Sequence, residues 1–508
     1  MCASSPSSSG PVVAMLPYTL LTLAVTLAAV VWKSASLQML VGLTYYLLPE
    51  TPEEKRRAAL ARIQEKKRAS SGAGGGVRRR GRAAGGPGGL GPLPEGVDDE
   101  SIAAITVQKS TLVLRPFWAE FNYLILFSLI VVANFAAAEV AARVPFMSDV
   151  LLMKENVMLP MLCLVAIMSA ARALVKVEMD SLTPAVERQL AAAVGVLGFI
   201  VSLFFLLLVP TSVMDFEMER TSREFAPALI RAIRRRVKGF EAAEDLSRAG
   251  GTLVVSELQI MIGLSIFAGV LAGAMFAPSV RVVRCYSTCV KPPAWGRDFV
   301  GVSTWAKPFL HAATALPLLA AVSWAKPLVQ EPLGLTDEAF VLARVGALLV
   351  VAATQLAATP SLVQGFLDGA LVVWYELKNG GQTLVGSPSA GGPTSEKKGF
   401  VAGASVMTEA RVRAAMRQKM EITNHIVCKV AVQAAAPAVL LLSCGCLLGC
   451  KRTDDAAASG ASDSIVGILP AVVWRTVASY LGWWSCTAWA IMTNLGVAMA
   501  KGGASTFA

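Results

Sequence analysis

Charged side chains are scarce in this chain of 508 residues, because Asp, Glu, Lys and Arg make up only 16% of it while 55% of its residues are hydrophobic. A soluble globular protein carries about a quarter charged residues. The deficit is uneven, since apolar stretches of about 20 residues alternate with short charged ones. A membrane β-barrel would instead show stretches of about ten residues with alternating polarity. The pattern therefore predicts an all-α integral membrane protein.

Histidine is rarer still, and its two residues, His311 and His425, are too few to favour a histidine-based metal centre or proton path. The chain has no GxxxxGK[ST], HExxH or GxSxG motif. Its GxGxxG match at 86–91 lies in a glycine-rich linker, without the strand and helix that a dinucleotide site needs. Cys444 and Cys446 have no second cysteine pair to complete a zinc site. We therefore expect no enzymatic activity, no catalytic residue, no metal and no cofactor.

The net charge of +11 comes almost entirely from one segment. Between Lys55 and Arg82 there are eleven Lys and Arg against one acid, Glu65. The segment follows a hydrophobic span, which is typical of a cytoplasmic loop that faces anionic lipid. No aromatic side chains are interleaved to stack on bases, so nucleic acid is not an expected partner. The predicted lipid-facing bases are Lys55, Arg56, Arg57, Lys66, Lys67, Arg68, Arg78, Arg79 and Arg80.

The apolar stretches predict a polytopic helical bundle of about nine transmembrane helices, with a range of about eight to ten, plus amphipathic interfacial helices. The first stretch has no basic residues before its long core, which favours a retained signal-anchor, with cleavage near Ala35 as the alternative. The predicted spans are 13–32, 118–141, 156–175, 190–209, 253–278, 308–328, 339–358, 427–449 and 476–500.

Composition divides the chain into five parts. They are a signal-anchor span (1–32), a basic and partly disordered cytoplasmic loop (33–115), a central bundle of spans two to seven (116–378), a flexible loop with a basic helix (379–424) and the C-terminal spans (425–508). With the N-terminus outside, the cytoplasmic loops hold about 30 Lys and Arg and the outer loops about 14, which favours a cytoplasmic C-terminus. The basic cluster at 231–238 is the exception.

Ionisable side chains inside these spans should face inward, because each costs at least about 2.5–3.5 kcal/mol in lipid. Arg344 lies about one and a half turns into its span. Those near span ends can instead extend to the interface. We predict a buried polar cluster that includes His311, Lys326, Arg344, Gln433, Arg475 and Glu139.

Several segments, in order along the chain, resemble the eukaryotic transmembrane protein 161 family. They are LVKVEMD (174–180), MFAPSVR (275–281), FLHAATALPLLAAVSWAKPL (309–328), SLVQGFL (361–367), QAAAP (433–437) and WRTVASYLGWW (474–484). The departures are an extended Gly/Ala/Arg linker near 74–91 and a Gly/Ser loop after Gly380. The resemblance adds Arg281 and Gln364 to the candidate polar cluster.

The resemblance implies a role in modulating cation currents or in resistance to oxidative stress, with no established reaction or substrate. We expect a non-enzymatic multi-pass protein of the plasma membrane or an endomembrane that regulates ion flux, with lipid and an ion channel or another membrane protein as partners. Two alternatives stay open. The buried cations could serve a transporter or channel for a small anionic solute or lipid headgroup, or the basic loop could make the chain a scaffold that binds anionic lipids.

Overall fold

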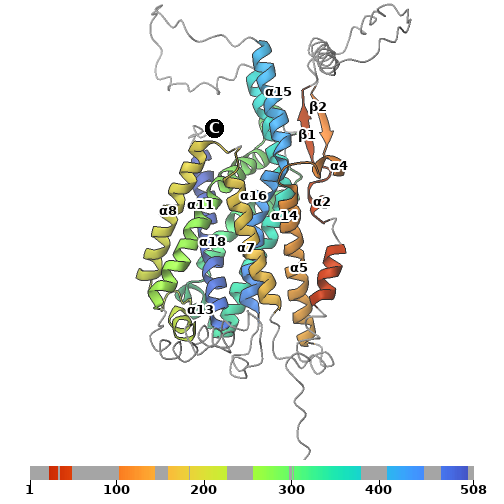
Figure 1. Cartoon of the computed structure of the whole chain (residues 1–508). Helices are drawn as coiled ribbons and strands as arrows, with labels where there is room; N and C mark the ends of the chain where they lie inside the picture. The colour runs from red at the N-terminus through yellow and green to blue at the C-terminus, as the bar shows by residue number, and fades with distance from the viewer. Residues whose placement is uncertain are drawn as a thin grey trace, which may run out of the picture.

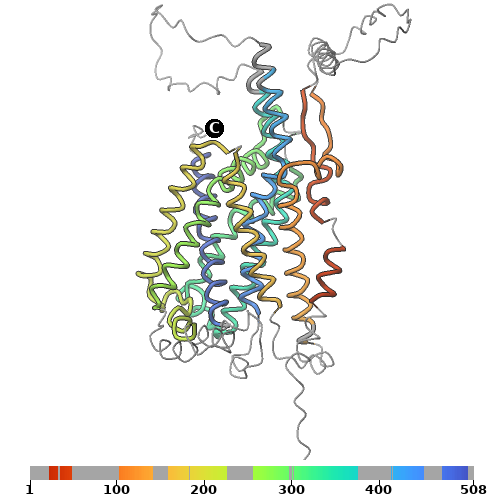
Figure 2. Tube along the Cα trace, viewed as in Figure 1, coloured from red at the N-terminus to blue at the C-terminus, as the bar shows by residue number. Residues whose placement is uncertain are grey.

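A computed structural model describes most of the predicted membrane body (Figure 2). The described residues are 22–31, 35–48, 102–143, 158–181, 183–225, 256–296, 300, 302–378, 409–450 and 471–501. The predicted basic lipid-facing residues, the amphipathic stretch around 231–238 and the linker at 74–91 lie outside them. Of the first predicted span, the described part is the apolar helix Thr22–Val31.

The described chain is a bundle of long helices that run up and down roughly parallel to one another (Figure 1). Uninterrupted apolar sequence gives helices here because a helix satisfies its own backbone hydrogen bonds within lipid. The bundle helices are α5 (Trp118–Arg143), α7 (Met158–Glu178), α8 (Ala185–Leu208), α11 (Glu257–Val290), α12 (Ala306–Val322), α14 (Asp337–Lys378), α16 (Val427–Gly449) and α18 (Ala471–Lys501).

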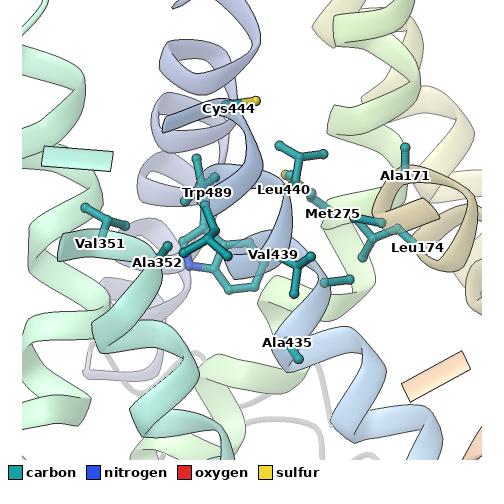
Figure 3. Packing of buried hydrophobic residues seen from close by; sticks show 14 of the residues in the cluster. Ala171, Leu174, Met275, Val351, Ala352, Ala435, Val439, Leu440, Cys444 and Trp489 are labelled. Carbon is teal, nitrogen blue, oxygen red and sulfur yellow. The ribbon is translucent and has the colours of Figure 1, made fainter. Parts of the chain in front are cut away.

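Helix α16 forms the centre of the bundle, where it contacts α5, α7, α11, α14 and α18. Each of its residues from Val427 to Leu448 is buried. Val439 and Leu440 of α16 lie among Leu174, Met275 and other apolar side chains from the surrounding helices (Figure 3). Helix α16 carries apolar residues on every face, with few polar ones among them, which is typical of a helix surrounded by other helices.

Helices α8 and α11 approach each other closely through small residues. A Cβ on Gly273 would lie 2.7 Å from the carbonyl oxygen of Ala191, and one on Gly269 would lie 2.8 Å from that of Gly195. Glycine is therefore required at both positions, as expected for helix pairs that pack in a membrane. The N-terminus of α11 has a capping box, in which Ser256 and Gln259 each bond the other's backbone N–H.

The predicted sixth span, 308–328, is wrong as a single helix. Helix α12 ends at Val322, and α13 (Lys326–Leu333) leaves at an angle of 79°. Pro327 explains the break, because proline disfavours helical backbone at the residue before it and is tolerated only in the first turn of a new helix. Gly334, with a left-handed φ of 60°, then ends α13.

The predicted seventh span, 339–358, is the first half of a longer continuous helix, α14. Helix α14 has 42 residues, which gives a length of about 63 Å, twice the hydrocarbon thickness of about 30 Å. It projects beyond the bundle beside α15 (Glu409–His425) (Figure 1). The projecting part of α14 also contacts strand β1 (Thr44–Leu47).

A small antiparallel sheet was not predicted within the 33–115 loop. Strand β1 pairs with β2 (Ala103–Thr106) in the register Thr44↔Thr106 and Leu47↔Ala103. Short connecting elements flank the sheet and the bundle helices. They are α2 (Ala35–Leu40), α4 (Lys109–Leu112) and the 3-10 turn η1 (Ala294–Gly296).

The structure gives a range for the number of membrane spans and does not confirm the predicted nine. Among the described residues, six helices are long and apolar enough to cross a membrane, or seven with α12 and α13 counted as one bent span. Helix α18 also runs the length of the bundle (Figure 1), but its many aromatic and hydroxyl side chains make it less apolar. The all-α multi-pass architecture is confirmed.

Candidate functional site

The eight candidate polar residues do not form one cluster. The structure places three of them at one end of the bundle, two at the other end, and three in separate contacts. The two ends are those of α8, whose 24 residues span about 36 Å.

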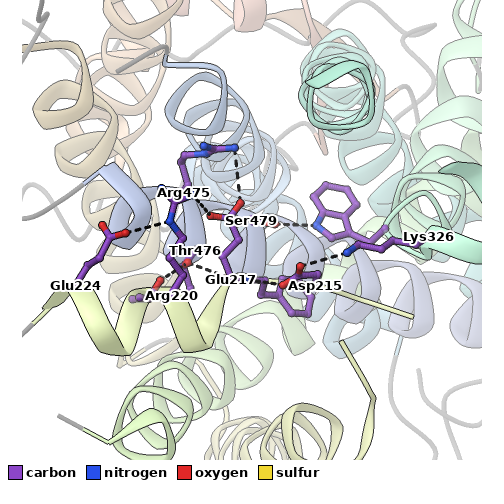
Figure 4. A network of polar contacts seen from close by, with 11 residues as sticks. Asp215, Glu217, Arg220, Glu224, Lys326, Arg475, Thr476 and Ser479 are labelled. Carbon is purple, nitrogen blue, oxygen red and sulfur yellow. Dashed lines mark hydrogen bonds and ion pairs between the residues drawn. The ribbon is translucent and has the colours of Figure 1, made fainter. Parts of the chain in front are cut away.

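The first group, the Asp215 network, lies beside the C-terminal end of α8 (Figure 4). The Lys326 ammonium lies 3.2 Å from a carboxylate oxygen of Asp215, and the Arg475 guanidinium 3.7 Å from one of Glu217. Further members are Phe216, Arg220, Thr221, Glu224, Trp324, Arg344, Thr476 and Ser479.

The turn that carries Asp215 and Glu217 is held firmly against the bundle. Asp215 accepts a 2.8 Å hydrogen bond from the backbone N–H of Glu217, whose φ of 55° is unusual for a residue other than glycine. The Thr476 hydroxyl donates to the carbonyl of Phe216 at 2.9 Å. Lys326 donates its backbone N–H to the carbonyl of Val213 at 2.9 Å. These bonds fix the polar segment after α8 across the bundle end.

Arg344 is the most buried cation of the Asp215 network, with 6% of its surface exposed. Its guanidinium donates to the Trp324 carbonyl at 3.2 Å and lies 4.1 Å from the centre of the Phe340 ring. The Trp324 indole in turn donates to the Ser479 hydroxyl at 3.0 Å. The aromatic rings and a carbonyl shelter this charge from lipid. Arg344 thus ties α14 to the α12–α13 break and does not reach a carboxylate directly.

The second group, the Arg281 network, lies at the opposite end of α8. Arg281 donates to the Gln433 amide oxygen at 2.5 Å and to a carboxylate oxygen of Glu187 at 2.7 Å. These bonds join α11 to α16 and to the first turn of α8. The sequence resemblance placed Arg281 and Gln433 in the same cluster, and the structure brings these two together.

Two acids and a lysine complete the Arg281 network. Lys429, 2% exposed, donates to Asp180 at 3.0 Å and to the Thr183 hydroxyl at 2.9 Å. Glu178 is 5% exposed, and neither of its carboxyl oxygens has a hydrogen-bond partner. A buried carboxyl group without a partner is costly, so Glu178 is the exceptional residue at this end.

The remaining three candidates lie apart from both networks. His311 is exposed and bonds the Tyr286 hydroxyl at 2.9 Å. Glu139 forms an ion pair with Arg143 of the same helix, α5, at 3.8 Å. Gln364 accepts from the backbone N–H of Thr44 at 2.9 Å and so anchors strand β1 to α14.

The contact between β1 and α14 also raises the pKa of a tyrosine, Tyr46. The Tyr46 hydroxyl donates to Asp368 at 3.4 Å. Burial, and then the negative charge of Asp368, raise the pKa of Tyr46. Tyr46 therefore stays neutral at physiological pH and acts as a hydrogen-bond donor.

Sequence reasoning missed the acids that neutralise these cations. Asp180, Glu187, Asp215 and Glu217 lie at or beyond the ends of predicted spans, where an acid is ordinarily solvated. The available signal was the excess of cations within the spans, which requires nearby carboxylates. Glu178 was also visible in the LVKVEMD segment.

The described residues contain no group of three or more His, Cys, Asp or Glu side chains arranged to hold a metal ion. The eight cysteines among them are free thiols, and seven are buried. The network geometry can bind small charged or hydrogen-bonding groups.

Comparison with known proteins identifies the membrane body. No curated protein and no solved structure matches the chain. A family model described as predicted transmembrane protein 161AB matches residues 20–380, which is more than half of the 508-residue chain and includes both polar networks in part. The chain therefore belongs to the transmembrane protein 161 family, a family of multi-pass integral membrane proteins.

Proposed function

We propose that this protein is a non-enzymatic regulator of ion flux that acts on a separate channel and conducts no ions itself. The resemblance to the family implies modulation of cation currents. The plasma membrane or an endomembrane is the proposed location, with lipid and a channel as partners. The observation that carries the proposal is the apolar packing around α16.

A conducting pathway needs polar groups or water along the bundle axis. Helix α16 is buried along its full membrane length by five other helices, and after Gln433 its side chains pack mainly against apolar ones. Apart from Asp368 at the contact between β1 and α14, the described buried charged residues lie in the Asp215 and Arg281 networks, at opposite ends of α8. Between them lie side chains such as Leu348, Val439 and Leu440, all buried. This packing favours a regulator over a pore.

The pairing of the cations weakens the alternative of an anion transporter. Lys326, Arg475, Arg281 and Lys429 each face a carboxylate of the same chain at 2.7–3.7 Å. An anionic solute would have to displace these carboxylates, whose attraction to the cations is strong where water is excluded. The cation excess seen in the spans therefore supports internal ion pairs.

Reconstitution tests the proposal directly. Purified full-length protein in liposomes should give no K⁺, Na⁺, Ca²⁺ or Cl⁻ flux above empty liposomes, with a known channel as the positive control. In cells, removal of the protein should change a cation current, and the wild-type chain should restore it. Ion flux through liposomes containing only this protein would overturn the proposal.

A second arm distinguishes a regulator from a lipid scaffold. Neutralising the eleven bases between Lys55 and Arg82 should abolish function in a scaffold that binds anionic lipid. A regulator that works through its membrane helices should retain its effect on the current. Loss of the current effect, with the protein still present at the membrane, would favour the scaffold.

A further inference from the structure

An apolar groove opens on the outer surface of the bundle, between the end of α7, the first half of α8 and the middle of α11. Its volume is about 810 Å³, within the range of sites that bind small molecules. Val175, Val196, Phe199 and Ile266 are among the apolar side chains that line it. Along α8 it extends from residue 185 to residue 199, about 21 Å, which is somewhat more than the hydrocarbon depth of one leaflet.

The groove is apolar along its length but polar at one end. Glu178, Arg188 and Gln189 line that end, next to the first residue of α8, Ala185. Arg188 is exposed, and α8 begins after Pro184 without a side-chain cap. An uncapped helix N-terminus beside an arginine attracts an anion such as phosphate. This feature alone would not define a site.

Glu178 supplies the second, independent observation. Glu178 lines the groove, and only 5% of its surface is exposed. Neither of its carboxyl oxygens has a hydrogen-bond partner. The neighbouring charges explain why. Arg281 pairs with Glu187 and Lys429 pairs with Asp180. The third cation at this end, Arg188, is exposed and forms no ion pair with Glu178, so the Glu178 carboxyl group is left without a partner.

Glu178 therefore lacks a hydrogen-bond donor, and Arg188 together with the start of α8 offers a phosphate site beside it. A lipid with a phosphoethanolamine headgroup carries both groups, an ammonium with three N–H donors and a phosphate, on one short linker. Its acyl chain has the length and polarity that the groove requires. Phosphatidylcholine has the same charges but no N–H donor on its nitrogen.

We propose that this groove is a binding site for phosphatidylethanolamine, with its ammonium at Glu178, its phosphate at Arg188 and the start of α8, and an acyl chain lying in the groove on the outer surface of α8 and α11. Each carboxyl oxygen of Glu178 has less than 1 Å² exposed. The ammonium therefore reaches Glu178 through a rotation of the side chain, which already lines the groove. The proposal does not depend on the role in ion flux.

Native mass spectrometry of the purified full-length protein tests this site. The wild-type chain is exposed to lipids with identical acyl chains and zero, one, two or three methyl groups on the headgroup nitrogen. Binding should fall with each methyl group and should be about tenfold weaker for phosphatidylcholine than for phosphatidylethanolamine, as expected for one charged hydrogen bond. Equal binding of the four lipids, or equal binding of phosphatidylglycerol, would overturn the proposal.

Variants separate the headgroup from the chain. Glu178→Gln keeps the shape of the side chain and should remove the preference for ethanolamine while leaving lipid bound. Ala192→Trp, on an exposed position that lines the groove, should remove both. Ala193→Trp is the matched control, since Ala193 is exposed on α8 but does not line the groove. An unchanged preference in the Glu178→Gln protein, or equal losses for the two tryptophan variants, would contradict the assignment.

Discussion

The two ends of the bundle use the same kind of residues for different purposes. In the Asp215 network the pairs are partly solvated, with side-chain exposures of 28% and 37% for Lys326 and Asp215. In the Arg281 network they are more buried, with 3% and 17% for Lys429 and Asp180. The partly solvated end is a set of clamps that hold a turn in place. At the buried end, removal of one partner of an ion pair should cost much stability, and one acid there, Glu178, has no partner.

This difference teaches that pairing and burial must be considered together. A partly exposed ion pair gains little, because water and salt screen it. A buried pair also gains little over an apolar pair, but the loss of one partner leaves a buried charge with nothing to offset it. The two networks should therefore respond very differently to equivalent substitutions.

The largest effect is expected at Lys429. Asp180→Ala removes its carboxylate partner and should lower the free energy of unfolding by about 3–5 kcal/mol, because the buried ammonium is left without a carboxylate. Thermal unfolding in detergent micelles measures the loss. The double variant Asp180→Ala/Lys429→Met should recover part of it, since the unpaired charge is then absent. A double variant that is less stable than Asp180→Ala would contradict the interpretation.

A smaller loss of stability is expected when the close packing of α8 against α11 is disturbed. This packing brings Glu187 on α8 to Arg281 on α11. Gly273→Ala places a Cβ 2.7 Å from the carbonyl oxygen of Ala191, and such overpacking should cost about 1–3 kcal/mol. Gly263→Ala is the matched control on the same helix. A Cβ there has nothing within 4 Å and should add about 0.5–1 kcal/mol through its helix propensity. If both variants lose the same amount of stability, the close approach of α8 and α11 at Gly273 does not contribute to the stability of the bundle.

The smallest effect is expected at the Asp215 network. Lys326→Ala removes a pair that is about one-third exposed and should cost at most about 1 kcal/mol. Moderate salt should reduce the difference from the wild-type chain further. Thermal unfolding at low and high ionic strength measures both values. A loss as large as that of Asp180→Ala would remove the distinction between the two ends.

The sequence was sufficient for the architecture because hydrophobic length decides which segments can cross a bilayer. The bounds of α16 were predicted without error. The break between α12 and α13 was missed, although Pro327 was visible, since the apolar sequence continues past it. The sheet of β1 and β2 was missed because its two strands are separated by a long polar segment.

The polar networks were only partly predictable, because the sequence does not show which helices pack against each other. Lys326 and Arg475 were expected in one cluster, and they do share the Asp215 network. His311, Glu139 and Gln364 were expected with them but point to other neighbours. Hydrophobic periodicity locates each helix along the chain, but it does not say which helices are adjacent or which face each one turns inward. The partners of the cations come from connecting segments, which such periodicity does not describe.

The most direct test of the apolar bundle centre uses cysteines that the chain already carries. Cys444 and Cys486 are fully buried inside the bundle, Cys486 at the midpoint of α18, whereas Cys450 at the end of α16 is partly exposed. In lipid nanodiscs, a water-soluble, membrane-impermeant thiol reagent should label Cys450 and leave Cys444 and Cys486 unmodified, as followed by peptide mass spectrometry. Labelling of Cys444 at the rate of Cys450 would place water at the centre of the bundle and would contradict a protein that regulates ion flux without conducting ions.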